Sequence, residues 1–212
     1  MRILQAYKND PELREAFIAE LQWHQDQDKV IQGAYREGTN GDFRGCAVGC
    51  AIHSLARIRK EDLSCGQHQL LEDLLDIPVE LAYLIDGIFE AIPEERAKQF
   101  PLRIGKAIRV GADLTMIVPQ FLFWMLSDPK EGMISRFDHS EFPDCAVAVN
   151  AVIALFKNLL GGQIITEAAW SAAWSAAESA AWSAAWSAAW SAARSAARIR
   201  QAEKLIELLE AA

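Results

Sequence analysis

Three cysteines and two histidines lie close together in one stretch of the chain, and they are the residues best suited to chemistry. In the segment GCAVGCAIH, Cys46, Cys50 and His53 are spaced i, i+4 and i+7, so on a helix they share one face. Cys65 and His68 follow in a C-x-x-H arrangement. Because thiolate and imidazole are common ligands of tetrahedral zinc, one hypothesis is a zinc site drawn from these residues.

The same segment allows two other interpretations. A Cys50–His53 pair is a candidate nucleophile and base, provided that a helix terminus or a cation lowers the pKa of the thiol. Alternatively, Gly45, Cys46, Gly49 and Cys50 form a face of small residues for close helix packing, since a buried free cysteine behaves as a small hydrophobe. We favour close packing, with the Ala-Ser tract near the C-terminus as the expected partner.

Other titratable residues carry weaker signals. His24, beside Trp23, is predicted to be solvated or to lie at an interface, and Asp86 and Glu90 are predicted to lie on the polar face of an amphipathic helix.

Helical periodicity dominates the elements that must position these residues. Asp10-Pro11 combines an N-cap with a first-turn proline, and the apolar stripe that follows predicts a helix ending near Gly33. Runs of alternating β-branched residues are absent, so the predicted fold class is all-α, a multi-helix bundle. Further helices are predicted over residues 46–57, 68–75, 76–93, 102–110, 112–126, 143–160 and 166–211. The expected domains are a helical body (1–162) and a long C-terminal helix rich in Ala, Ser and Trp (163–212).

Composition narrows the possible partners and compartment. The chain has 212 residues and a formal net charge of −8, which argues against direct binding to nucleic acid or to an anionic membrane. No apolar run reaches the length of a membrane span, and the N-terminal residues lack the pattern of a signal peptide. We therefore expect a cytoplasmic protein whose cysteines are thiols or metal ligands rather than disulfides.

The tract AAWSAAWSAAESAAWSAAWSAAWSAARSAAR (168–198) repeats every four residues and is predicted to be helical. Each residue turns about 100°, so successive tryptophans advance by about 40° and spiral around the axis. A straight helix over 166–211 would be about 69 Å long, whereas a compact domain of this chain length is about 43 Å across. Part of the helix must therefore bend or project.

A projecting helix with exposed tryptophans favours a homodimer in which the helices of two chains pack together. A bent helix at the centre of its own bundle is the alternative, and a stacking ladder for nucleobases or sugars is a third. The predicted interaction residues are Trp170, Trp174, Trp182, Trp186 and Trp190.

Four segments together resemble an uncharacterised all-helical family of phage, prophage and mobile-element proteins. They are GCAVGCAIH (45–53), IPVELAYLIDGIFEAIP (77–93), AIRVGADL (107–114) and the Ala-Trp-Ser tract. The resemblance implies a small phage-type accessory protein, and inhibition of a host defence system by direct binding is the expected role.

Two functional hypotheses follow. The first is a non-enzymatic helical protein-interaction module, acidic and dimeric, that binds a protein partner as an anti-defence (anti-CRISPR-like) inhibitor and needs no cofactor. The alternative is a metal-dependent or thiol-dependent enzyme, with zinc as the metal, centred on Cys46, Cys50, His53, Cys65 and His68.

Overall fold

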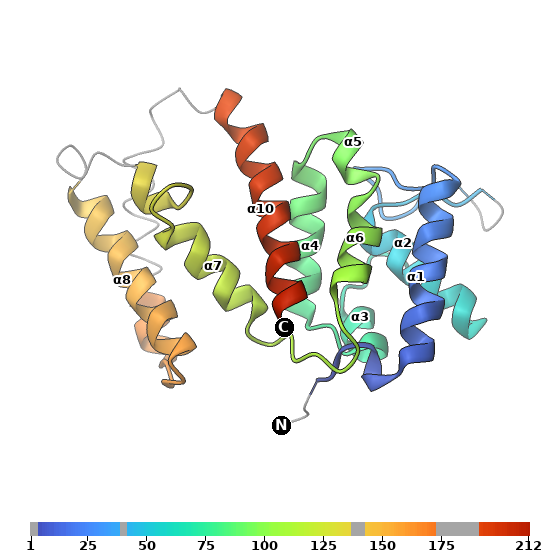
Figure 1. Cartoon of the computed structure of the whole chain (residues 1–212), viewed down its shortest axis with the longest axis horizontal. Coiled ribbons are helices and arrows are strands. Elements are labelled where there is room, and N and C mark those ends of the chain that lie inside the picture. The colour runs from blue at the N-terminus through green and yellow to red at the C-terminus, as the bar shows by residue number, and fades with distance from the viewer. Residues whose placement is uncertain (1–3, 39–41, 137–142, 173–190) are drawn as a thin grey trace. The chain divides into compact units, whose positions relative to one another are not determined.

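The computed structural model describes residues 4–38, 42–136, 143–172 and 191–212. Its fold is all-α, as predicted, and within these ranges the β-type pairings are two isolated bridges. Two 3-10 helices, η1 (Ala6–Asn9) and η2 (Met133–Arg136), accompany the α-helices, and residues 167–172 are also helical. The α-helices are α1 (Pro11–Asp26), α2 (Ala47–Arg59), α3 (Gln69–Leu75), α4 (Val79–Ala91), α5 (Glu94–Ala97), α6 (Phe100–Ala107), α7 (Ile117–Ser127), α8 (Pro143–Leu160) and α10 (Ser191–Ala211) (Figure 1).

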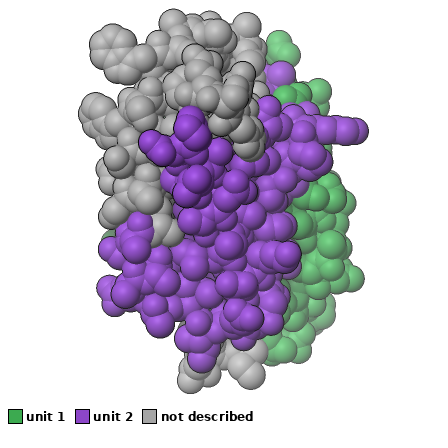
Figure 2. All heavy atoms as spheres, turned by 90° about the vertical axis from the view of Figure 1, so that its left-hand side faces the viewer, with its two compact units in different colours: residues 1–117, 198–212 green, residues 118–197 purple. Residues whose placement is uncertain are grey.

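The chain divides into two compact units, which Figure 2 shows in different colours. Unit 1 contains residues 1–117 and 198–212, and unit 2 contains residues 118–197. The predicted boundary lay at residue 162, whereas unit 2 already begins at residue 118 and the last turns of α10 belong to unit 1. There they bury the apolar side chains of Ala202, Leu205, Ile206 and Leu209.

Helix α1 begins where its local signals place it. The Asp10 carboxylate accepts hydrogen bonds from the backbone N–H groups of Glu12 (2.9 Å) and Leu13 (3.1 Å), and Pro11 occupies the first turn. The predicted end near Gly33 was wrong, since the helix stops at Asp26. Asp28 has a φ of 51°, which turns the chain out of the helix.

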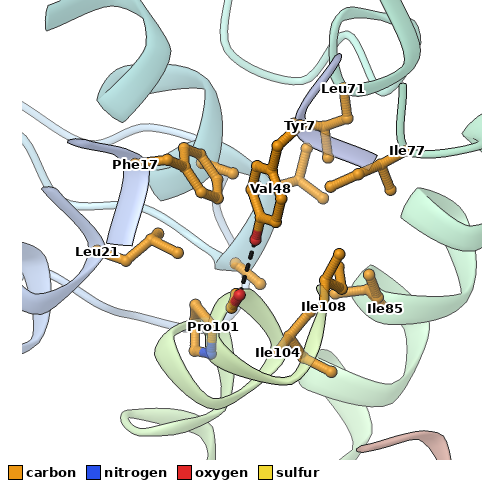
Figure 3. Close-up of a pocket in the computed structure, with 13 residues that line it drawn as sticks. Tyr7, Phe17, Leu21, Val48, Leu71, Ile77, Ile85, Pro101, Ile104 and Ile108 are labelled. Atoms are coloured by element: carbon orange, nitrogen blue, oxygen red, sulfur yellow. Dashed lines mark hydrogen bonds between the residues drawn. The ribbon is translucent and has the colours of Figure 1, made fainter. Parts of the chain in front are cut away.

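The core of unit 1 contains the fully buried side chain of Tyr7. Its hydroxyl donates a hydrogen bond of 2.7 Å to the carbonyl oxygen of Gly105, and burial raises the pKa of the phenol. An apolar cavity of about 40 Å³ lies beside this hydrogen bond (Figure 3). The cavity is far smaller than the pockets that hold small-molecule ligands, so we treat it as a packing defect of the core.

Unit 2 has a smaller apolar cluster around Val152 and Phe156. The Trp170 ring belongs to it and packs edge-on against Phe156, with ring centroids 4.9 Å apart. Of the predicted interaction residues, Trp170 thus packs within its own unit. Trp174, Trp182, Trp186 and Trp190 lie outside the described residues.

The predicted helix over 166–211 is helical at residues 167–172 and 191–211, on either side of residues that the structure does not describe. The helix predicted over 112–126 begins later, at Ile117. Among the described residues, no helix combines the length and the apolar character that crossing a membrane requires.

Candidate functional site

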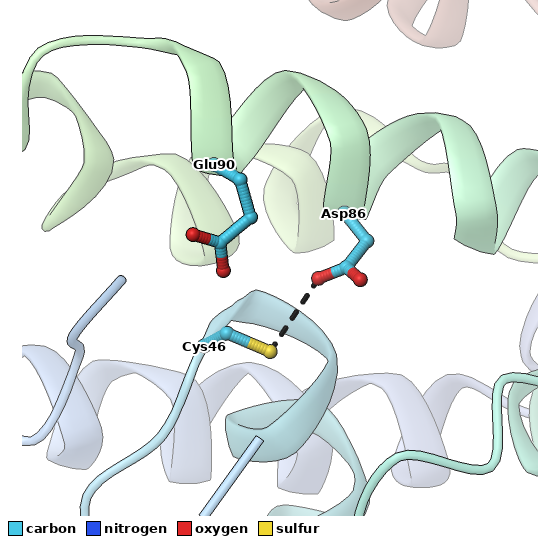
Figure 4. Close-up of side chains that lie close together, drawn as sticks. All are labelled: Cys46, Asp86 and Glu90. Atoms are coloured by element: carbon cyan, nitrogen blue, oxygen red, sulfur yellow. Dashed lines mark hydrogen bonds between the residues drawn. The ribbon is translucent and has the colours of Figure 1, made fainter. Parts of the chain in front are cut away.

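A group of side chains from separate segments converges on Asp86 of α4. Asp86 and Glu90 are one helical turn apart, and both extend toward Cys46 at the start of α2 (Figure 4). One potential ligand atom from each of the three residues lies within 4.8 Å of the other two. We call these three residues, with His68 and Tyr35, the Asp86 cluster.

Cys46 joins the cluster because it caps α2. Its backbone is extended, and its Sγ accepts a hydrogen bond of 3.4 Å from the backbone N–H of Gly49. The thiol donates in turn to Oδ1 of Asp86, also at 3.4 Å. Burial, followed by the effect of the Asp86 charge, raises the pKa of this thiol to about 12. Cys46 is therefore a neutral thiol at physiological pH.

The second carboxylate oxygen of Asp86 accepts two further hydrogen bonds. Nε2 of His68 lies 3.2 Å from Oδ2, and the hydroxyl of Tyr35 lies 3.3 Å from the same atom. Because a carboxylate only accepts, Nε2 of His68 carries the proton. Asp86 thus fixes the orientation of one imidazole, one phenol and one thiol.

Two tyrosine rings surround the His68 imidazole, which is 4% exposed. The Tyr83 ring stacks on it, with a centroid distance of 4.0 Å and an interplanar angle of 17°. The Tyr35 ring contacts it edge-on at 5.7 Å. Both phenols also reach solvent, since Tyr83 is 60% and Tyr35 is 42% exposed.

The segment that carries Tyr35 is tied to α4 next to the cluster. Oε2 of Glu90 accepts a hydrogen bond of 2.8 Å from the backbone N–H of Gly33. The side-chain amide of Gln32 donates to the carbonyl oxygens of Phe89 (2.7 Å) and Ile92 (2.9 Å), near the end of the helix. These bonds hold the loop that presents Tyr35 in place.

A second polar pair, His24 and His53, lies between α1 and α2. Nε2 of His24 and Nδ1 of His53 are 2.8 Å apart, and Nδ1 of His24 lies 2.7 Å from the carbonyl oxygen of Glu20. The carbonyl only accepts, so Nδ1 of His24 is protonated and its Nε2 accepts the proton of His53. The Phe43 ring stacks on His53 at 3.9 Å.

Burial lowers the pKa of both histidines to about 4, so the pair is neutral at physiological pH. The positive charge of Arg57 lowers both values further. The prediction that His24 is solvated or interfacial was wrong. Its side chain is completely buried, because α1 places it on the face that packs against α2.

The five residues predicted as zinc ligands lie in different surroundings. Cys46 and His68 both contact Asp86, whereas His53 pairs with His24. The Cys50 thiol is buried and donates to the Gly45 carbonyl oxygen at 3.3 Å, and Cys65 is half-buried. Among the described residues, the group with metal-ligand spacing is Cys46, Asp86 and Glu90, so it contains one of the five.

The two carboxylates of this group were predicted to lie on the polar face of an amphipathic helix. Their i, i+4 spacing was visible in the sequence, but their approach to a thiol some 40 residues away was not.

The small residues at the start of α2 pack closely against the loop at Tyr35, and most of the Ala-Ser tract that we expected there lies outside the described residues. A Cβ atom on Gly49 would overlap the carbonyl oxygen of Tyr35, and a Cβ on Gly45 would meet the same atom at 2.5 Å. The backbone of the loop at Tyr35 occupies the space beside these two glycines. Gly45 and Gly49 therefore position the loop that carries the Tyr35 side chain to Asp86.

Comparisons with known proteins found no significant match. No protein-family model matches the chain, and no curated protein or solved structure gives a significant match.

Proposed function

We propose that this protein is a non-enzymatic helical protein-interaction module, and that Tyr83 and Tyr35 contribute to its binding surface. The observation that carries the proposal is the environment of Tyr83. Its side chain is 60% exposed, yet its ring is held by stacking on the buried His68, which Asp86 orients in turn.

An aromatic side chain held in this way is well suited to binding. Tyrosine is enriched among the residues that dominate interface energetics, because it offers a large contact area together with a polar hydroxyl. A ring that is already fixed loses less conformational entropy when a partner covers it. Tyr35, held by its hydrogen bond to Asp86, extends the same surface.

The state of the thiols supports binding rather than thiol catalysis. A nucleophilic cysteine needs a lowered pKa, whereas burial raises the pKa of Cys46, Cys50 and Cys65. The Cys50 thiol and the His53 imidazole also have separate hydrogen-bond partners, Gly45 and His24. A catalytic pair would need a hydrogen bond between Cys50 and His53, whereas here each side chain bonds to a different residue.

The resemblance to phage and mobile-element proteins leads us to propose the setting of this binding. In it the protein acts as an accessory or anti-defence (anti-CRISPR-like) inhibitor that occupies a surface of its target. Self-association of the Trp-bearing helix into a homodimer, and a cytoplasmic location, remain part of this proposal.

Site-specific photo-crosslinking tests the binding surface. A benzophenone amino acid is placed at position 83 of the full chain, or at the exposed position 19 on α1 as the matched control, in cells that express the protein. A discrete adduct from position 83 that is missing from position 19 is the expected result. Equal labelling from both positions, or none from position 83, would overturn the proposal.

A metal-binding role is the second candidate, favoured by the geometry of Cys46, Asp86 and Glu90. A thiolate and two carboxylates are acceptable zinc ligands, provided that the metal displaces the proton of the thiol. Native mass spectrometry after addition of zinc tests it. One bound ion per chain that is lost in the Cys46→Ser variant would support the role, and no bound ion would exclude it.

A further inference from the structure

The exposed face of α4 combines negative charge, an aromatic ring and a glycine. At about 100° per residue, Glu80, Asp86, Gly87 and Glu90 all lie within about 60° of Tyr83 around the helix axis. Glu80, Tyr83, Gly87 and Glu90 are exposed, and Asp86 is partly exposed. We call these five residues the α4 face.

Within the described part of the chain, the carboxylates of the α4 face have no lysine or arginine partner, and the basic neighbour of Asp86 is the His68 imidazole at 3.2 Å. Among the residues that the structure describes, no lysine or arginine lies within ion-pair distance of Glu80, Asp86 or Glu90. Like charges at i, i+4 on a helix repel each other, as Asp86 and Glu90 do here. A cation brought to this face would relieve the repulsion, and the negative net charge of the chain would attract it.

The Tyr83 ring provides a defined place for such a cation. One of its faces stacks on His68, so its exposed area belongs mainly to the other face and the ring edge. The ammonium of a lysine or the guanidinium of an arginine binds favourably over the face of an aromatic ring. Here the nearby carboxylates would strengthen that contact.

Gly87 leaves open space on this face. A glycine inside a helix costs about 1 kcal/mol relative to alanine. Among the described residues nothing requires a glycine here, since its φ is not positive and a Cβ at this position would meet no described atom within 4 Å. A missing side chain does, however, let another molecule approach the helix backbone closely.

We infer that the α4 face binds a basic segment of the partner protein, with a lysine or arginine side chain over the Tyr83 ring and the partner backbone close to Gly87. This inference rests on the proposed interaction function and specifies the chemistry of the partner. It requires negative charge, an accessible ring and open space above Gly87 at the same time.

Fluorescence anisotropy of a labelled octalysine peptide, titrated with the full chain at low salt, tests the inference. We expect the Tyr83→Ala and Glu90→Gln variants each to weaken binding about threefold, in line with exposed cation–π and charge contacts. Glu90→Gln keeps an acceptor for the Gly33 N–H. The control, Glu15→Gln on the exposed side of α1, loses the same charge and should leave the affinity within about 1.5-fold of the parent.

The Gly87→Gln variant separates binding from stability. Glutamine favours the helix over glycine, so this variant should unfold at a higher urea concentration while it binds the peptide at least about fivefold more weakly. Unchanged binding by Gly87→Gln, or an equal loss in Glu15→Gln and Glu90→Gln, would overturn the inference. A position-83 adduct without peptide binding would overturn it too, but would leave the interaction function standing.

Discussion

Acidification from pH 7 to pH 4.5 is expected to destabilise unit 1 through the His24–His53 pair. At neutral pH one proton lies between Nδ1 of His53 and Nε2 of His24, which are 2.8 Å apart. A further proton on His24 would bring two N–H groups face to face, so the hydrogen bond would be lost. The positive charges of Arg57 and Lys29 near His24, and of Arg57 and Arg36 near His53, also oppose protonation.

The sign and size of the change in unfolding free energy follow from the pKa of His24 in the folded and in the unfolded chain. An unfolded histidine titrates near pH 6.5, whereas the pKa of the buried His24 is about 4. The unfolded chain therefore binds more protons between these values. The contribution of His24 to the free energy of unfolding is complete above pH 6.5 and is lost as the pH falls to 4. The difference is worth about 3 kcal/mol, and His53 acts in the same direction as part of one coupled titration.

Urea unfolding followed by circular dichroism at pH 7.0, 6.0, 5.0 and 4.5 measures this contribution. The control is His24→Phe, which keeps an aromatic ring beside Phe43 but cannot take up a proton. Carboxylates titrate alike in both proteins and His53 is present in both, so the difference between the two pH profiles isolates His24 and its coupling to His53. We expect the profile of the parent to fall more steeply, by about 1.4 kcal/mol per pH unit near pH 5.

Parallel pH profiles for the parent and His24→Phe would refute this reasoning. That result would mean that His24 takes up a proton in the folded protein as readily as in the unfolded chain.

Three other predictions follow from the packing of unit 1 and from the proposed assembly. Gly49→Ala should lower the free energy of unfolding by about 2 kcal/mol, because its Cβ overlaps the loop backbone, whereas Gly87→Ala should raise it by about 0.5–1 kcal/mol. Urea titrations of both variants check these two predictions, and a stabilised Gly49→Ala variant would contradict the close packing of Gly49 against the Tyr35 loop. Iodoacetamide labelling with peptide mapping at pH 7.5 should modify Cys65 well before the fully buried Cys46 and Cys50, and similar rates for the three thiols would contradict their burial. A native mass spectrum at micromolar concentration should show a dimer, and a monomer alone would exclude self-association.

Local signals predicted the fold well where they act alone. The start of α1 needs only Asp10 and Pro11, and the α4 prediction needs its own apolar spacing, so the start of α1 and both ends of α4 lie within a few residues of the predicted positions. The end of α1 was misplaced because we extended the apolar stripe of Leu13, Phe17 and Leu21 to Val30, which at about 100° per residue lies on the opposite side of the helix from Leu21. In the structure Val30 is held by a bridge to Gly45 instead.

The site was less accessible to prediction because its members are distant in sequence. Spacing along one helix grouped Cys46, Cys50 and His53, but the three residues face different neighbours. Cys46 turns to Asp86 because it caps the helix, and His53 turns to His24 on α1. Periodicity within a single segment cannot predict these contacts, because they join residues of different helices.

The division of the chain also has a consequence for synthesis on the ribosome. Unit 1 recruits its final core residues from α10, after the whole of residues 118–197 has been translated. Until Leu205 and Leu209 emerge, the sites that they fill stay open to solvent and to chaperones. Unit 2, in contrast, is continuous in sequence. A ribosome that stalls before residue 198 would therefore leave unit 1, which carries the Asp86 cluster, with an incomplete core.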